Sequence, residues 1–455
     1  MGAASAPALQ SRHGDKESIR GRTLRRQPVG CVTPQASPSS TRPKAQWWRF
    51  AAGRSPAYLP LLASPARVTA IAFVILACLV GARWITGSYD WTYFVVAGDQ
   101  FTNPRTTPMR VHVAEGPGYD GQFFLRLAFE PFTARRTAWG IELDGPAWRQ
   151  QRIVYPLIVH IAALGQPRWV PFTLVAVNLV GVTVLVLACS VLAGRVGLAP
   201  AWGILPAFFP GLTMGLARDL AEPLNACLLT LAVFACTSAS FGWATLALAA
   251  AALTRETTMI SVAAVAATVA RLALHRSAPA SAWSRVVLMG LAPAVGLLAW
   301  HSALRVLWGA WPAAIGVHSG FITTYPLEGL IEAYSQVWRH RPPLHNLATG
   351  LYLAWMVSLA VEVVRSLGSL PPGASPARRL SLAWCRTAWL AWTAFALFLS
   401  RATWEANPGL VRHMTEWAIM GFLALLLAAR PPRLQLVGLT AAVFLGTVAR
   451  LLTGP

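Results

Sequence analysis

The chain has 455 residues, of which 55% are hydrophobic and only 12% are charged, and its formal net charge is +21. Soluble domains carry about twice this charged fraction, so the composition excludes an ordinary soluble enzyme. Apolar runs of roughly 17–25 residues recur along the chain, which is typical of a polytopic membrane protein. No aromatic-basic module accompanies the positive charge, which argues against nucleic-acid binding.

Residues 1–66 are predicted to form a basic, disordered cytoplasmic tail. They hold ten lysines and arginines against two acids, Asp15 and Glu17, and are rich in Ser, Pro, Ala and Gly. Such a segment buries too little apolar surface to fold alone, and it is too long and too basic for a cleaved signal. It either fixes the orientation of the chain or contacts anionic lipid headgroups.

Residues 67–455 are predicted to be an all-α transmembrane domain with about 11 spans. The spans are 67–86, 170–193, 202–217, 222–240, 243–254, 257–274, 286–308, 346–367, 381–400, 414–429 and 434–453. The distribution of arginines between these runs places the N-terminus in the cytoplasm and makes 87–169 and 309–345 large extracytoplasmic loops. The run 153–165 rises only about 20 Å, too short to cross, so we expect an interfacial helix there.

Two predicted hairpins are unusually tight, and they carry charge. The runs around ARDLAEPL (217–224) and TRET (254–257) leave almost no loop, which favours broken or re-entrant elements. Arg218 and Glu222 are four residues apart and are predicted to pair, which leaves Asp219 without a local partner. Arg255 and Glu256 interrupt apolar sequence on both sides, either as part of a functional site or as caps of an outer hairpin.

The stretch GPGYDGQFF (116–124) places one carboxylate, Asp120, between two glycines. Gly118 and Gly121 are expected to allow unusual backbone angles and the close approach of a ligand. A helix from Gln122 onward would lie on the membrane surface with its Phe/Leu face buried in lipid. Asp120 would then face a lipid-linked substrate, or it would simply cap the helix.

Arg149 and Arg152, in DGPAWRQQRIVYP, are three residues apart. A helix would present both on one face, which suits a phosphate or pyrophosphate, although interfacial anchoring explains them equally well. The sequence contains no HExxH, CxxC, P-loop or dinucleotide-binding motif, and its histidines lack ligand spacing, so no metal site is predicted. On the predicted topology most acids lie on the outer side, where any chemistry is therefore expected.

The stretches GYDGQFF, DGPAWRQQRIVYPL, ARDLAEPL and ALTRETT resemble the GT-C superfamily of integral-membrane glycosyltransferases, which use polyprenyl-phosphate-linked sugars. More narrowly, they look like a bacterial group of cell-surface glycopolymer-formation proteins. The resemblance covers most of 67–430 and implies a multi-pass protein of the bacterial cytoplasmic (inner) membrane. It also implies a glycosyltransferase that moves sugar from a polyprenyl-phosphate donor to a cell-envelope glycan, lipid or protein.

The resemblance assigns roles to residues of this chain. Asp120 becomes the catalytic base. The substrate and lipid-phosphate contacts become Arg149, Arg152, Arg255, Tyr119, Gln122 and Tyr155, with Arg218, Asp219, Glu222 and Glu256 as supporting charges. The paired-acid motif of many relatives is missing, so no cofactor is firmly expected and a divalent cation remains open. The alternatives are a transporter or flippase of lipid-linked sugars and a non-catalytic subunit of a glycopolymer-assembly complex.

Overall fold

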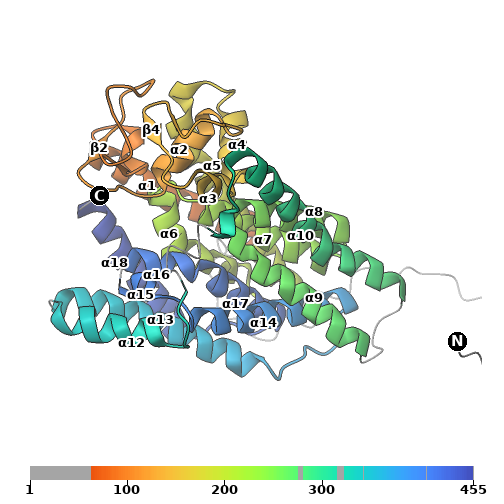
Figure 1. The fold of residues 1–455 in the computed structure, drawn as a ribbon. Coiled ribbons are helices and arrows are strands. Elements are labelled where there is room, and N and C mark those ends of the chain that lie inside the picture. The colour runs from red at the N-terminus through yellow and green to blue at the C-terminus, as the bar shows by residue number, and fades with distance from the viewer. Residues whose placement is uncertain (1–62, 275–279, 315–321, 342, 406, 454–455) are drawn as a thin grey trace, which may run out of the picture. The chain divides into compact units, whose positions relative to one another are not determined.

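The computed structural model describes residues 63–274, 280–314, 322–341, 343–405 and 407–453, all within one structural unit, Ser55–Pro455. The predicted tail lies outside the described residues except for 63–66. The described chain is mainly helical (Figure 1). Its α-helices are α1 (Pro65–Thr86), α2 (Gly121–Phe129), α3 (Pro146–Gln150), α4 (Val154–Ala162), α5 (Val170–Arg195), α6 (Pro210–Ala217), α7 (Glu222–Thr237), α8 (Phe241–Thr254), α9 (Met259–Leu274), α10 (Ala280–Trp308), α12 (Glu328–Glu332), α13 (Pro343–Ser366), α14 (Pro376–Ala396), α15 (Arg401–Glu405), α16 (Asn407–His413), α17 (Thr415–Leu427) and α18 (Leu434–Thr453).

The remaining elements are short. The 3-10 helices are η2 (Trp91–Phe94), η3 (Pro167–Trp169), η4 (Pro200–Phe208), η5 (Glu256–Thr258) and η7 (Trp338–His340), and η6 (Ala333–Val337) is a π-helix. Strand β1 (Ala97–Gly98) pairs in parallel with β2 (Val113–Ala114), with Ala97 opposite Val113. Strand β3 (Thr137–Ala138) pairs antiparallel with β4 (Ile141–Glu142), with Thr137 opposite Glu142.

Five helical segments are long and apolar enough to cross a membrane: Pro65–Thr86, Pro167–Arg195, Val287–Trp308, Asn346–Ser366 and Leu434–Thr453. Each corresponds to one of the predicted spans. Their exposed apolar side chains, such as Phe73 in α1 and Leu298 in α10, are compatible with contact to lipid. The fold is therefore compatible with a multi-pass membrane protein.

The predicted span 202–217 is two elements rather than one helix. It divides into η4 and α6 at Phe209, whose extended backbone precedes Pro210. Helix η4 packs tightly on α5, because a Cβ atom on Gly203 would stand only 2.2 Å from the backbone nitrogen of Ser190. The broken element that the tight ARDLAEPL hairpin predicted is present at this position.

Four further predicted spans are short helices. Helices α7, α8, α9 and α17 have 16, 14, 16 and 13 residues, so even α7 rises only about 24 Å. All 13 residues of α17 are buried, against α5, α7, α13 and α14. A helix that is apolar on every side is an interior helix, so protein surrounds α17.

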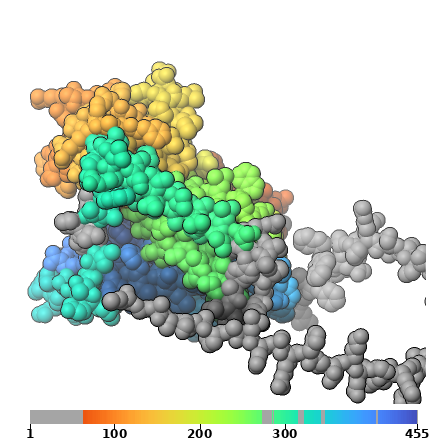
Figure 2. Space-filling view, turned by 45° about the vertical axis from the view of Figure 1, so that its right-hand side comes forward, coloured from red at the N-terminus to blue at the C-terminus, as the bar shows by residue number. Residues whose placement is uncertain are grey.

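Residues 87–169 form a folded segment that packs on α5, α8 and α10. Figure 1 shows β2, β4, α2, α3 and α4 grouped at one end of the helices, and Figure 2 shows the orange and yellow residues of this segment as one continuous surface. All nine residues of α2 are buried. The prediction that α2 lies on the membrane surface is therefore wrong, because its Phe/Leu face packs against α4 and α5 instead of lipid. Helix α4 has nine residues, as its short run predicted, and ends beside the exposed side chain of Leu164.

Candidate functional site

A tight glycine turn sets the position of Asp120. Gly118 has a φ of +65°, a conformation that favours glycine. A Cβ on Gly121 would stand 2.5 Å from the carbonyl oxygen of Val95 and 2.7 Å from that of Arg218. The expectation that Gly121 allows a ligand to approach closely is therefore wrong, because the backbone of Val95 and Arg218 occupies the space beside it. The buried Gln122 stabilises the turn by accepting from the Gly98 amide and donating to the Pro117 carbonyl.

The carboxylate of Asp120 contacts three guanidinium groups. Arg149 Nη1 lies 2.7 Å from Asp120 Oδ1, while Arg412 Nη2 and Arg152 Nη1 lie 2.6 and 3.6 Å from Oδ2. Asp120 precedes α2, but its side chain makes no capping hydrogen bond. The carboxylate therefore pairs with the arginines and does not cap the helix. Its side chain is 19% exposed, which leaves the cluster open to an incoming group.

These contacts control the ionisation of Asp120. Burial raises the pKa of the Asp120 carboxyl, but the positive charges of Arg412, Arg149 and Arg152 outweigh burial and hold the pKa well below its usual range. The carboxylate is therefore ionised at every physiological pH. In this state Asp120 is an anchor for cations and only a weak proton acceptor, because an efficient base has a pKa near the working pH.

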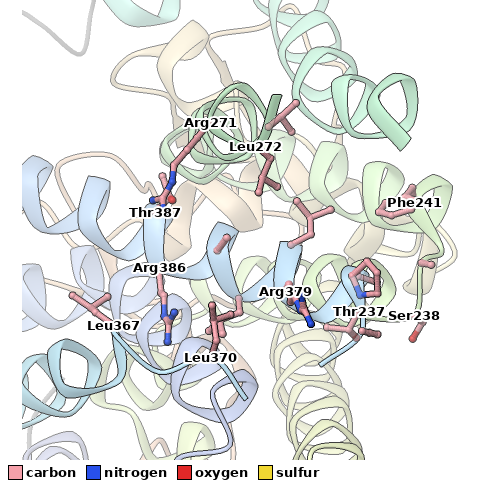
Figure 3. A pocket seen from close by; sticks show the side chains of 18 of the residues that line it. Thr237, Ser238, Phe241, Arg271, Leu272, Leu367, Leu370, Arg379, Arg386 and Thr387 are labelled. Atoms are coloured by element: carbon pink, nitrogen blue, oxygen red, sulfur yellow. The ribbon is translucent and has the colours of Figure 1, made fainter. Parts of the chain in front are cut away.

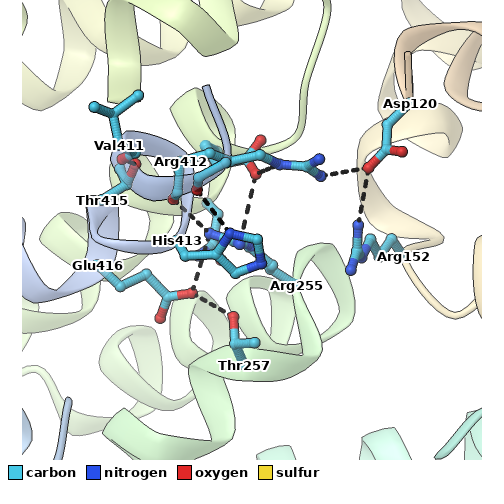
Figure 4. Close-up of polar contacts among 12 residues, drawn as sticks. Asp120, Arg152, Arg255, Thr257, Val411, Arg412, His413, Thr415 and Glu416 are labelled. Carbon is cyan, nitrogen blue, oxygen red and sulfur yellow. Dashed lines mark hydrogen bonds and ion pairs between the residues drawn. The ribbon is translucent and has the colours of Figure 1, made fainter. Parts of the chain in front are cut away.

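Each of the three arginines also contacts a second carboxylate. Arg149 forms a bidentate pair with Asp144, at 2.7 Å for both hydrogen bonds. Arg152 forms another with Glu256, at 2.7 and 2.8 Å. Arg412 donates its Nε to Glu222, and Figure 4 shows Arg412 and Arg152 reaching Asp120 from different parts of the chain. The arginines are thus fixed in orientation by acids on their far sides.

A second, more deeply buried layer lies behind Arg412. Arg255 lies 3.6 Å from Glu222 and 4.0 Å from Glu416, and its Nη1 donates to the carbonyl oxygen of Arg412 at 3.3 Å. The hydroxyls of Thr257 and Thr258 donate to the two oxygens of Glu416. The side chains of Arg255, Glu222 and Glu416 are at most 3% exposed. This layer positions Arg412 but offers little access to a ligand.

The structure brings most of the predicted site residues together, with changed partners. Arg149 lies in α3 and Arg152 lies two residues beyond its end, yet both side chains reach Asp120. Arg255 and Glu256 join the cluster from the N-terminal end of η5, where Glu256 pairs with Arg152 and Arg255 lies near Glu222. Arg218 and Glu222 do not share a helix, because α6 ends at Ala217 and α7 begins at Glu222. The carboxylate of Glu222 contacts Arg412 and Arg255.

Three aromatic or polar predictions have different outcomes. The Tyr119 ring lies beneath two guanidiniums, 4.8 Å from that of Arg218 and 5.7 Å from that of Arg412. Tyr155 does not join the cluster: its buried hydroxyl donates to the carbonyl of Leu174 and accepts from Asn178. The assignments of Tyr155 and Gln122 as substrate contacts are therefore wrong, because both side chains are fully buried and their polar groups form hydrogen bonds within the protein.

Asp219 lies apart from the Asp120 cluster. It is fully buried, has a φ of +50°, and neither carboxylate oxygen has a hydrogen-bond partner among the described residues. Burial raises the pKa of Asp219 well above its usual range, opposed by the charge of Arg83. Asp219 lies in the turn between α6 and α7, and none of the ion pairs of the Asp120 cluster includes it.

Sequence reasoning missed Arg412, Thr257 and Thr258, and it did not connect Glu416 with the site. Arg412 is the residue that joins Asp120 to Glu222. Its signal was the charged stretch VRHMTE (411–416) directly before the apolar run of α17, which is the same kind of interruption that drew attention to Arg255.

The donor set at this cluster does not fit a divalent cation. Magnesium and calcium require several oxygen ligands that face a shared point. Here the carboxylates of Asp120 and Glu256 face guanidinium groups, and no group of three or more His, Cys, Asp or Glu side chains suited to a metal occurs among the described residues.

Comparisons with known proteins return no match for this chain. No protein-family model matches it, and neither a curated protein nor a solved structure does.

Proposed function

We propose that this protein is a membrane glycosyltransferase that moves a sugar from a polyprenyl-phosphate-linked donor to a cell-envelope acceptor, outside a bacterial cytoplasmic membrane. The observation that carries the proposal is the convergence of Arg149, Arg152 and Arg412 on the partly exposed Asp120. Three guanidiniums around one point are the arrangement that binds a phosphate, because each presents several N–H donors. The multi-pass arrangement with about 11 crossings belongs to the same proposal.

The proposed reaction needs only these groups. The acceptor hydroxyl oxygen attacks the anomeric carbon of the sugar, and the bond from that carbon to the phosphate oxygen breaks. The phosphate leaves with the electron pair, and the arginines stabilise its growing negative charge. The hydroxyl proton passes to Asp120. One carboxylate is sufficient, because a phosphate-linked sugar already carries a good leaving group.

The resting ion pairs explain how donor binding activates Asp120. Each arginine around Asp120 is already paired, so a phosphate binds by taking guanidinium N–H groups from that carboxylate. The loss of these contacts removes the cause of the low pKa of Asp120 and makes it a stronger base. Asp120 is therefore a competent base only when the donor is present.

The test is transfer by the purified protein in lipid nanodiscs. Polyprenyl-phosphate-linked hexoses and pentoses with radiolabelled sugars serve as donors, with an extract of cell-envelope glycan as acceptor. Asp120→Asn should abolish product formation while the protein remains folded by size-exclusion chromatography. Glu115→Gln is the matched control, because it makes the same charge change at an exposed position of the same segment. Near-normal transfer by Asp120→Asn would refute the role of Asp120.

The same preparation distinguishes a transporter from a transferase. The charges of the cluster lie at helix ends, including the first residue of α7 and the first residue of η5, which favours a surface reaction over a translocation path. Movement of the lipid-linked sugar across vesicles without a change of its bonds would instead establish transport.

A further inference from the structure

A second site is a cavity of about 1230 Å³ at the other ends of α7 and α9. Helix α7 begins at Glu222 in the arginine cluster and ends at Thr237 in the cavity wall. Helix α9 likewise follows Thr258 and brings Leu272 to the cavity. At about 1.5 Å per residue, each helix separates the two sites by roughly 20 Å. The cavity is therefore distinct from the Asp120 cluster.

The wall of the cavity is apolar apart from a cationic stripe. Phe241, Leu272 and Leu380 are among its apolar residues, and Figure 3 shows Arg379 and Arg386 along one side of α14. These arginines are seven residues apart, so they share a helix face and lie about 10 Å from each other along the axis. Arg271, from α9, also lines the cavity, whereas no Asp or Glu is among the described residues that line it.

The cationic stripe is oriented but not neutralised by acids. Arg379 Nε donates to the carbonyl of Ala374 at 3.0 Å. Arg386 Nη2 donates to the carbonyls of Ser366 and Ser369, at the end of α13. Its Nε is buried and has no hydrogen-bond partner among the described residues. Carbonyl oxygens fix these guanidiniums in place and leave most of their positive charge available.

We propose that this cavity binds an anionic membrane phospholipid, with its acyl chains against the leucines and its phosphates at Arg379 and Arg386. The large apolar wall matches hydrocarbon chains, and basic pockets between transmembrane helices bind phosphate headgroups. A lipid with two phosphates suits the two arginines best, because their separation exceeds the width of one phosphate. The basic segment 1–66 is an unsuitable occupant, since its ten lysines and arginines would be repelled.

Native mass spectrometry of the purified full chain tests this proposal. The protein in detergent is mixed with diphosphatidylglycerol, phosphatidylglycerol or phosphatidylcholine at equal concentration. The wild type should retain diphosphatidylglycerol about tenfold more than phosphatidylcholine. The Arg379→Gln/Arg386→Gln double variant should lose this preference, whereas Arg430→Gln, an exposed arginine outside the cavity wall, should keep it.

Two further measurements separate the proposal from a folding defect and from an ion site. Arg386→Lys keeps the charge and should keep the lipid, while Thr387→Trp fills the cavity and should release the lipid without changing the charge. Excess inorganic phosphate should leave the lipid in place, because the chains supply most of the contact. Equal retention of phosphatidylcholine, retention by the double variant, or displacement by phosphate would overturn the proposal.

Discussion

Removal of Arg412 should lower the stability of the protein strongly. It joins the side chains of Asp120 and Glu222, and the Glu222 side chain has no exposed surface. Arg412→Met would leave the Glu222 carboxylate buried with only Arg255, which lies 3.6 Å away. Removal of one partner of a buried ion pair costs about 3–5 kcal/mol, because the remaining charge is desolvated without compensation. We therefore expect a loss of unfolding free energy in this range.

The assay is equilibrium unfolding in mixed micelles of SDS and a mild detergent, with a double-mutant cycle. Arg412→Met leaves the charge of Glu222 without its main partner, and Glu222→Gln removes that charge. The double variant should therefore lose about 1–3 kcal/mol less unfolding free energy than the sum of the two single losses. Arg401→Met is the matched control. It breaks an exposed pair with Glu405 and should cost no more than about 1 kcal/mol. Additive single losses, or a cost for Arg412→Met no larger than the control, would refute this account of the cluster.

Three other perturbations follow from the same geometry. Gly121→Ala should cost about 1–3 kcal/mol of unfolding free energy, because its Cβ meets backbone, whereas Gly242→Ala, whose Cβ meets nothing within helix α8, should cost none and should stabilise the protein by up to about 1 kcal/mol in the same assay. Burial raises the pKa of the Glu256 carboxyl, but the charge of Arg152 outweighs burial and lowers the pKa to about 2. The ionised carboxylate therefore contributes its full stabilisation to the folded state above about pH 4.3, the pKa of an unperturbed Glu, and this stabilisation disappears as the pH falls through 2. The stability difference between wild type and Glu256→Gln should therefore be constant from pH 7 to 5 and shrink below pH 4. Since the pKa of Asp120 lies below its usual range, kcat/KM for transfer by the wild type should show no acid limb between pH 5 and 8, and a fall of kcat/KM with an apparent pKa in this range would contradict the geometry.

The long apolar helices were predictable from the sequence, because a run of about 20 apolar residues is a local property. Helices α1, α5 and α18 match their predicted runs closely. The sequence also indicated a broken element in 202–217, because the ARDLAEPL turn is too short to leave a loop between two full spans. Local patterns failed where burial was decided by other elements: α2 has the composition of an interfacial helix, but α4 and α5 cover it.

The composition of the site was predictable only in part, for a related reason. Charges that interrupt apolar sequence marked Arg255 and Glu256, and a glycine turn marked Asp120. Partner choice, however, depends on how distant helices pack, which spacing along the chain does not encode. Arg218 and Glu222 have the spacing of a helical pair but are separated by a helix boundary, and Arg412 reaches Asp120 from the far end of the chain.

The interior position of α17 has a consequence for how the protein is made. A helix that enters a bilayer alone needs a surface that faces lipid, and every residue of α17 is buried by protein. Helix α17 can therefore reach its final position only after α5, α7, α13 and α14 have packed together. Arg412 and Glu416 travel with this late segment. During synthesis, Asp120 and Glu222 therefore lack their shared cation until nearly the whole chain has emerged, and a chain that stops before residue 412 cannot complete the Asp120 cluster.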